Sequence, residues 1–476
     1  MFDIYETYSK RNDRYRMTYL LWRLMMKKLD MTEGNIMSLL LRFAIPLMLG
    51  DLFQQLYIAV DSAMIGNFAG AIPLAAVGST TFLIRLVIGL FIGMSVGASV
   101  VVAQAVGAKN YEKVNGVIHT IISLAFVGGI FLSIFAVFIT PYLLDLVSTP
   151  AEVMPAAVIY LKIYFAGALF NLIFNVCSSI MQAFGDSKRP FIYLVISSII
   201  NIILDYAFIK WFGMGIAGAA LATIISQLIS MILILINMSA TKEEYHISLR
   251  KLHIQACYIK EILQMGVPTG LQSAIVGLSN VIMQESINEA GKAAMAGFGV
   301  FNKVDGIIML PLASVALACT TFSGQNYGAG NRRRVRRGIS SIIVLEMIGW
   351  ILGSLVCVLG GKAIFGLFTN DAEIIKYAVM TMNYMIPLYW CMEIGYALTC
   401  IFRGMGKSHQ ASILFIFNMC IVRVGFLWVM NHLSTVDLCA NVLKAYQFSW
   451  IMTFIGSVLY ALYLNYKGEF SNIEEV

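Results

Sequence analysis

Acidic and amide side chains stand inside two long apolar runs in the first half of the chain. Asp61 lies near the end of one run, and Asn201 and Asp205 lie four residues apart in another, so the latter two share one face of a helix. A carboxylate in apolar surroundings is costly unless it has a partner or a task. Such groups can supply the hard oxygen ligands that sodium prefers. Alternatively, two nearby carboxylates can share a proton, or the groups only hold helices together by hydrogen bonds.

Further charged residues lie deep in other apolar runs. Glu393 and Arg423 are predicted to form an internal ion pair or, alternatively, to belong to a substrate and proton site. We expect Arg85 and Asp305 to line a cavity or to pair with other buried groups. These four residues are therefore candidates for contact with a substrate.

The run that contains Asp61 also holds a proline and a glutamine of interest. Pro46 lies fifteen residues before Asp61, and a proline removes a backbone hydrogen bond and favours a bend. The bend can serve motion, or it can be a passive kink. Gln54 is expected either to face a cavity or to pack between helices.

The composition places these residues in a membrane protein. Of the 476 residues, 59% are hydrophobic and only 12% are charged, about half the charged share of a soluble domain. An ordinary soluble enzyme, a disordered regulator and a nucleic-acid-binding protein are thereby excluded. The apolar runs do not alternate with polar residues, so a β-barrel is not expected. The sequence contains no HExxH or GxSxG pattern, and no enzymatic activity or bound cofactor is predicted.

The apolar runs predict an all-α polytopic membrane protein with twelve transmembrane helices, because each run has roughly the 20 residues that a span requires. The expected spans lie near residues 39–62, 73–98, 116–140, 156–181, 190–209, 214–238, 259–284, 294–320, 338–360, 377–401, 410–430 and 445–465.

The polar segments divide the chain and orient it. We expect a basic extension over residues 1–33, lobes over 34–240 and 259–466, a cytoplasmic linker over 241–258 and a tail over 467–476. With both termini in the cytoplasm, 23 of the 33 Lys and Arg residues fall inside and 5 fall outside. This bias predicts a multi-pass protein of the inner cell membrane with cytoplasmic termini. Residues 1–30 contain no spanning run, so transport is expected to proceed without them.

The two halves of the chain repeat each other. The segment Gln104–Val114 matches Gln325–Val335 at five of eleven positions with an offset of 221 residues. The same offset places Ala183–Ser187 on Gly404–Ser408. Each unit has six spans, an even number, so both enter the membrane in the same direction. This parallel repeat predicts two six-helix lobes related by a pseudo-two-fold axis, with a cavity between them where alternating access can occur.

These segments together resemble the multidrug and toxic compound extrusion (MATE) family of transporters. The residues that carry the resemblance are Pro46, Val60–Gly66, Gln104–Val114 with its repeat, Met181–Pro190, Asn201–Asp205, Gly213–Thr223 and Arg403–Ser408. It extends over about residues 34–466.

The resemblance implies secondary efflux of cationic or amphipathic organic compounds, driven by the entry of Na⁺ or H⁺. It further implies a cation site in the first lobe, formed by Asp61, Asn201, Asp205 and Thr223, and a first span that can bend at Pro46. The expected partners are small organic substrates and the lipid bilayer, with no nucleic acid, and the chain is expected to act as a monomer. A flippase for lipid-linked saccharides, from the same superfamily, is the alternative function.

Overall fold

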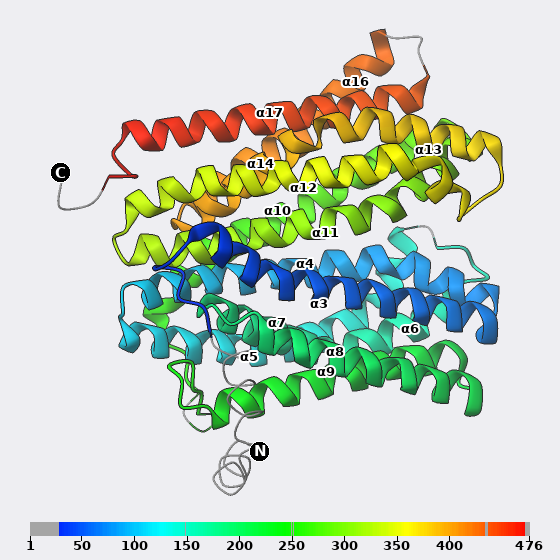
Figure 1. Cartoon of the computed structure of the whole chain (residues 1–476). Helices are drawn as coiled ribbons and strands as arrows, with labels where there is room; N and C mark the ends of the chain where they lie inside the picture. The colour runs from blue at the N-terminus through cyan, green and yellow to red at the C-terminus, as the bar shows by residue number, and fades with distance from the viewer. Residues whose placement is uncertain (1–27, 148, 249, 251, 434–436, 472–476) are drawn as a thin grey trace, which may run out of the picture.

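The computed structural model describes residues 28–147, 149–248, 250, 252–433 and 437–471. Every regular element in this part of the chain is a helix, and the long helices run roughly alongside one another (Figure 1). The helices of the first half are α3 (Ile36–Met64), η1 (Ile65–Ala69), α4 (Ala71–Gly107), α5 (Tyr111–Leu146), α6 (Met154–Ala166), α7 (Ala168–Ala183), α8 (Lys188–Asp205), η2 (Tyr206–Trp211) and α9 (Gly215–Ala240).

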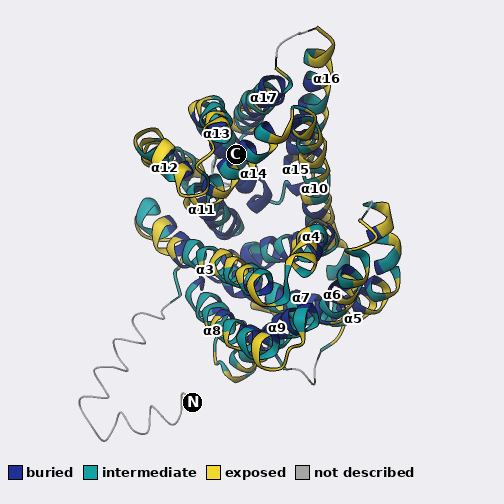
Figure 2. Ribbon diagram, turned by 90° about the vertical axis from the view of Figure 1, so that its right-hand side faces the viewer, coloured by how far each residue is buried: buried dark blue, intermediate teal, exposed yellow. Residues whose placement is uncertain are grey.

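The second half follows the same plan. Its helices are α10 (Ala256–Glu289), α11 (Lys292–Gly328), α12 (Arg332–Gly366), α13 (Ala372–Met385), η4 (Ile386–Leu388), α14 (Tyr389–Gly404), α15 (Ser408–Ile416), η5 (Phe417–Val422), α16 (Arg423–Leu433) and α17 (Leu438–Tyr466). The first half, α3–α9, forms one lobe and α10–α17 forms the other (Figures 1 and 2). We call them the N-lobe and the C-lobe.

The number of spans depends on α10. By length and composition, ten described helices can cross a membrane, and the bent pair α6 and α7 makes an eleventh. The twelfth predicted span corresponds to α10, which has 34 residues and is long enough. Its middle contains Pro268, Thr269 and Gln272, which lower its hydropathy, and the last two side chains are buried within the protein. The all-α, multi-pass fold in two lobes is thus confirmed.

Two predicted spans are broken near their middle, at positions related by the repeat. In the N-lobe, α6 and α7 meet at Gly167 with a bend of 46°. In the C-lobe, the short 3₁₀ helix η4, which contains Pro387, separates α13 from α14. Gly and Pro are the usual causes of such kinks because one frees the backbone and the other removes a hydrogen bond. The hydropathy pattern alone did not predict either break.

The lobes contact each other through two glycine pairs. Gly93 and Gly97 of α4 face Gly270 and Gly266 of α10, and each pair is a GxxxG motif. A Cβ atom on Gly93 would lie 2.2 Å from the Cα of Gly270. Small residues spaced in this way let two helix backbones approach closely inside a membrane. The motif therefore explains why α4 and α10 pack against each other.

The segments after α9 and α17 both fold back onto the ends of their lobes. Tyr245 is fully buried and packs edge-on against Phe184 in the N-lobe. In the C-lobe, Phe470 is buried, and the neighbouring Glu469 accepts hydrogen bonds of 2.8 Å from Lys407 and Tyr327. Burial works to raise the pKa of Glu469, but these hydrogen bonds outweigh it and hold the pKa below its ordinary value.

Candidate functional site

The four residues of the predicted cation site come together inside the N-lobe. Asp61 lies near the end of α3, Asn201 and Asp205 lie on α8, and Thr223 lies on α9. Helix α8 packs against both α3 and α9. All four side chains are buried, and Asp205 has no exposed surface at all. Asp61 and Asp205 are near enough for their charges to interact, and Thr223 is buried on the adjacent helix α9. We call these four residues the N-lobe cluster.

Several polar atoms of this cluster have no protein partner. Oδ1 of Asp61, both carboxylate oxygens of Asp205, and both amide atoms of Asn201 are buried without a hydrogen bond. The Thr223 hydroxyl donates to the Ala219 carbonyl at 3.0 Å, which leaves its lone pairs available. Buried polar groups are nearly always satisfied in proteins, so an unsatisfied set of this kind requires an explanation. Four orphaned oxygens from three side chains fit the donor set of a sodium ion, and the two carboxylates equally fit a shared proton.

Electrostatics makes the cluster sensitive to a bound cation. The carboxylates of Asp61 and Asp205 are near enough for their charges to repel each other. No Lys or Arg of the described chain forms an ion pair with either of them. A cation or proton between them would relieve both the repulsion and the cost of burying charge.

Tyrosines surround the cluster on the neighbouring helices. Tyr57 of α3 and Tyr160 of α6 both lie close enough to feel the charges of Asp61 and Asp205. Gln54, half-buried one turn before Tyr57, is placed beside that tyrosine hydroxyl. Gln54 thus belongs to the surroundings of the cluster, a position that spacing alone did not reveal.

Each carboxylate lies within one turn before an irregular turn. Asp205 is the last residue of α8, and the π-helical turn η2 begins at Tyr206. Asp61 lies four residues before the π-helical turn η1, whose first residue, Ile65, donates its N–H to the Asp61 carbonyl. Such π turns are frequent at functional sites because they re-aim side chains locally. The same helix α3 continues as an α-helix through Pro46, so the proline does not interrupt it in this state.

The predicted ion pair between Glu393 and Arg423 is not formed. The Arg423 guanidinium donates to Ser449 Oγ and Asn280 Oδ1, each at 3.0 Å, and stacks 4.5 Å from the Tyr446 ring. All of these partners are neutral. The spacing of residues along α14 and α16 does not determine the faces from which the two side chains project. The ion-pair alternative was therefore wrong, and a role of the two residues in a substrate and proton site stays a prediction.

Glu393 instead lies near another acid that the sequence analysis missed. Glu346 of α12 is 1% exposed, both its carboxylate oxygens lack a partner, and its charge interacts with that of Glu393. Asp305 also interacts with Glu393 and accepts a hydrogen bond of 2.5 Å from Tyr389. The C-lobe thus has an acidic cluster of its own. Glu346 carried a signal, since it is an ionisable residue in the middle of an apolar run.

Arg85 belongs to α4, but its side chain lies outside the described residues. Of the remaining cavity candidates, Asp305 and Glu393 lie near each other in the C-lobe interior, and the Tyr446 ring on which Arg423 stacks is near enough to Asp305 to interact with its charge.

The lobes meet at one end through contacts that obey the repeat. The Gln104 side chain donates to the Gly404 carbonyl at 2.7 Å, and its repeat partner Gln325 donates to the Ala183 carbonyl at 2.8 Å. Since Ala183 and Gly404 are also repeat partners, each lobe gives the other the same hydrogen bond. We call this contact the lobe junction.

Two glycines permit the close approach at the lobe junction. A Cβ atom on Gly107 would lie 1.9 Å from the Gln325 carbonyl oxygen, and one on Gly328 would lie 2.0 Å from that of Gln104. Further along the same two helices, Cβ atoms on Gly78, Gly299 or Gly306 would meet nothing within 4 Å. Helices α4 and α11 are therefore tightly closed at the lobe junction, whereas these three glycines further along them have room for a Cβ atom.

Comparison with known proteins agrees with this arrangement. A family model described as MatE matches residues 46–207 and matches again over residues 268–429. The two matches span more than half of the chain and start at Pro46 and Pro268. The chain belongs to the MatE family. The MatE repeats run from α3 to η2 and from α10 to α16, so each contains the core of one lobe.

Relatives and solved structures extend the MatE comparison over most of the chain. The chain is 29% identical to "Probable multidrug resistance protein YpnP" of Bacillus subtilis, over 84% of this chain and 90% of that protein. It is 25% identical to "Probable multidrug resistance protein NorM" of Thermotoga maritima, over 87% and 89% of the two chains. A multidrug resistance MATE family transporter solved in an outward-facing conformation superposes with a TM-score of 0.85 at 24% identity, over 92% and 98% of the chains. A transporter of the MOP superfamily from Pyrococcus furiosus superposes with a TM-score of 0.85 at 23% identity, over 92% of this chain and 99% of that chain. These two structures share the fold.

Proposed function

We propose that this protein is a secondary active transporter that exports cationic or amphipathic organic compounds in exchange for Na⁺ or H⁺. The observation that carries the proposal is the buried N-lobe cluster, in which two carboxylates repel each other and four oxygens lack partners. The names of the relatives, which are multidrug resistance and export proteins, support drug-like compounds as the substrate class. They favour efflux over the alternative of flipping a lipid-linked saccharide.

Helix α3 connects the N-lobe cluster to the other lobe. Near its end α3 carries Asp61, and near its start Leu40 and Phe43 pack into an apolar cluster with Phe322 of the C-lobe. Pro46 lies between these two regions. A cation that binds at Asp61 changes the charge at one end of a helix whose other end touches the C-lobe. We infer that α3 couples the binding of the ion to the way the lobes pack against each other. Pro46 is the point at which this helix would bend.

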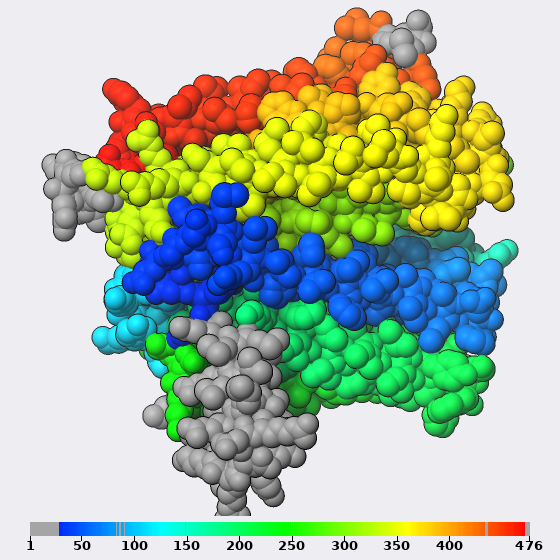
Figure 3. All heavy atoms as spheres, viewed as in Figure 1, coloured from blue at the N-terminus to red at the C-terminus, as the bar shows by residue number. Residues whose placement is uncertain are grey.

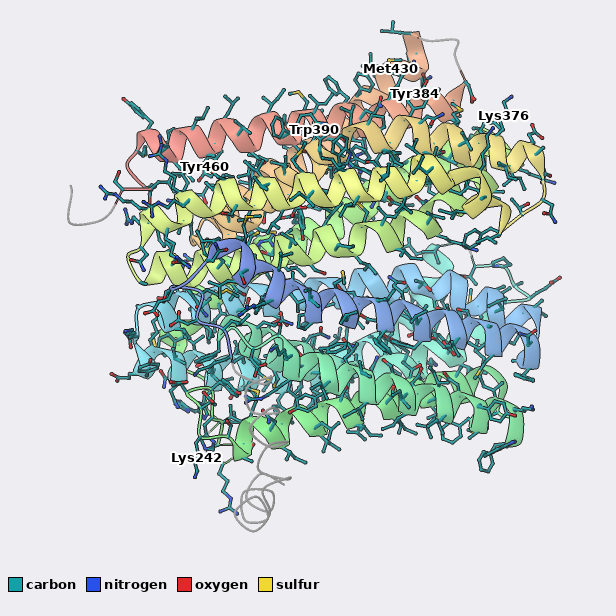
Figure 4. The ribbon with its side chains drawn as sticks, in the orientation of Figure 1. Lys242, Lys376, Tyr384, Trp390, Met430 and Tyr460 are labelled. Atoms are coloured by element: carbon teal, nitrogen blue, oxygen red, sulfur yellow. The ribbon has the colours of Figure 1, made fainter. Side chains whose placement is uncertain are left out.

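The orientation of the protein follows from its basic residues. Lys242, in the segment that joins the lobes, and Lys376, at the start of α13, lie at opposite ends of the molecule (Figure 4). We infer that the end with Lys242 and the lobe junction faces the cytoplasm, since most Lys and Arg residues gather there. In this state the closed end then faces inward. A single chain carries the whole site, which supports a monomer as the working unit.

Transport by reconstituted vesicles tests the proposal. Protein in liposomes is given a Na⁺ gradient or a pH gradient, and the movement of ethidium, a cationic dye, is followed by fluorescence. Asp61→Asn and Asp205→Asn should each reduce driven transport at least tenfold, whereas Asp145→Asn, at an exposed carboxylate of α5, should leave it unchanged. The gradient that drives the wild type identifies the coupling ion. If both cluster variants still build a dye gradient, the ion site is not where we place it.

A further inference from the structure

A short segment before α3 lies across the seam between the lobes, at the lobe junction. The segment comprises residues Lys28–Asn35, and in Figure 3 it belongs, with the start of α3, to the darkest blue atoms. Its first residue, Lys28, pairs with Glu243 at 2.7 Å and also with Glu244, both in the segment that follows α9. The chain therefore begins its described course on the N-lobe side.

The next contact attaches the segment to the N-lobe backbone. The Leu29 N–H donates to the Gly185 carbonyl at 3.1 Å. Gly185 has a φ of +83°, and a Cβ atom there would lie 1.9 Å from the Leu29 carbonyl oxygen. Only glycine fits both the left-handed backbone and the close approach of Leu29.

Two residues later the segment is attached to the C-lobe. Met31 is fully buried, its N–H donates to Gln325 Oε1 at 3.0 Å, and its carbonyl accepts from Asn326 Nδ2 at 2.8 Å. The Arg334 guanidinium donates to the carbonyls of Glu33 and Gly34 at 2.9 and 2.8 Å. Gln325 is the same residue that bonds the N-lobe at Ala183, so the segment is built into the lobe junction.

The spacing of these contacts links the segment to the state of the lobes. Leu29 on the N-lobe and Met31 on the C-lobe are two residues apart, and two residues span at most about 7 Å when fully extended. If the lobes separate at this end by more than a few ångströms, the segment must leave one of them. We propose that Lys28–Asn35 is a latch that stabilises the closed lobe junction and releases one lobe when that end opens.

The latch rests on the proposed function only in assuming that the lobes rock, and its test measures their separation directly. Nitroxide labels at Glu112→Cys in α5 and Ser340→Cys in α12, in a background without native cysteines, report the distance across the seam by pulsed EPR in lipid nanodiscs. Both positions are exposed. Arg334→Gln removes contacts to the latch, and Arg336→Gln, an exposed arginine of the same helix, is the matched control.

We expect Arg334→Gln to raise the ratio of open to closed protein about tenfold, since it removes three charged hydrogen bonds, to the carbonyls of Met31, Glu33 and Gly34. Arg336→Gln should leave the ratio unchanged. A second comparison uses a chain that starts at Met31 and a chain that starts with an added Met before Lys28. They differ only in the added Met and in Lys28, Leu29 and Asp30, and the shorter chain should be the more open one, again by about tenfold.

Three outcomes would overturn the latch: no shift in either comparison, equal shifts for the two arginine variants, or a single closed distance in every sample. Dye transport is measured on the same samples. Loss of transport in the wild type would count against the proposed function, whereas wild-type transport without a shift in the variants would count against the latch alone.

Discussion

Adding one methyl group at Gly107 should push the two lobes apart at the lobe junction. The new Cβ atom would lie 1.9 Å from the Gln325 carbonyl oxygen and 2.7 Å from its carbon, whereas ordinary contacts begin near 3.4 Å. Both obstacles are backbone atoms, which cannot rotate away as a side chain could. Helices α4 and α11 must therefore separate locally by about 1.5 Å in the Gly107→Ala variant.

The magnitude follows from the cost of inserting atoms into a packed contact. Overpacking by a methyl group typically costs about 1–3 kcal/mol. Because the strain exists only when the lobe junction is closed, it should raise the ratio of open to closed protein roughly 5- to 150-fold. Pulsed EPR between labels at Glu112 and Ser340 reports this ratio as the relative size of the long-distance and short-distance populations. A longer-distance population should grow in Gly107→Ala relative to the wild type.

Gly78→Ala on the same helix is the matched control. It gains the same intrinsic helix propensity, up to about 1 kcal/mol, but its methyl group meets nothing within 4 Å. Gly328→Ala should behave like Gly107→Ala because the two glycines are repeat partners, and the double variant should shift less than the sum of the singles. The reasoning fails if Gly107→Ala folds normally and keeps the wild-type distance distribution.

Three further predictions concern the ends of the molecule and the C-lobe. Glu393→Gln and Arg423→Gln should change the free energy of unfolding additively, within about 0.5 kcal/mol, because the two side chains do not pair; a larger coupling in a double-mutant cycle would show that they do. Glu469→Gln should destabilise the protein at pH 7 by less than about 1 kcal/mol, because the native pKa of Glu469 lies below its ordinary value. That stability is present above the unfolded pKa of about 4.3 and is lost as the pH falls, so melting curves of variant and wild type should converge near pH 3 and diverge at neutral pH. Single cysteines at Gly70 and Arg336 should react with an impermeant thiol reagent from opposite sides of the membrane, and labelling of both from one side would contradict the topology.

The sequence predicted the helices well because hydropathy is a property of long windows. All twelve predicted spans coincide with described helices, and the breaks inside two of them were missed because Gly167 and Pro387 each act at a single position within an apolar run. The contact between α4 and α10 was also missed. The two GxxxG motifs that form it are visible in the sequence, but a motif does not say which helix it faces.

The candidate sites likewise include features that the sequence predicted and features that it did not. Asp61, Asn201, Asp205 and Thr223 are all buried on neighbouring helices of one lobe, and their role as a cation site stays a prediction from the family resemblance. The predicted ion pair between Glu393 and Arg423 does not form. Residue number determines how deep a side chain lies along its helix, but packing determines the direction in which that side chain projects. Glu346 was overlooked although the cost of an ionisable group in a membrane span applies to it as much as to Asp61.

The exchange of hydrogen bonds at the lobe junction makes that interface isologous, as in a two-fold symmetric dimer, although both halves belong to one polypeptide. The glutamine hydrogen bond and the close glycine approach there each exist twice, once in each direction. A single substitution of Gln104 or Gln325 therefore removes only one copy and leaves the other to hold the lobes together. Scanning the closed end one residue at a time will consequently underestimate its contribution, and only paired substitutions, 221 positions apart, will expose it in full.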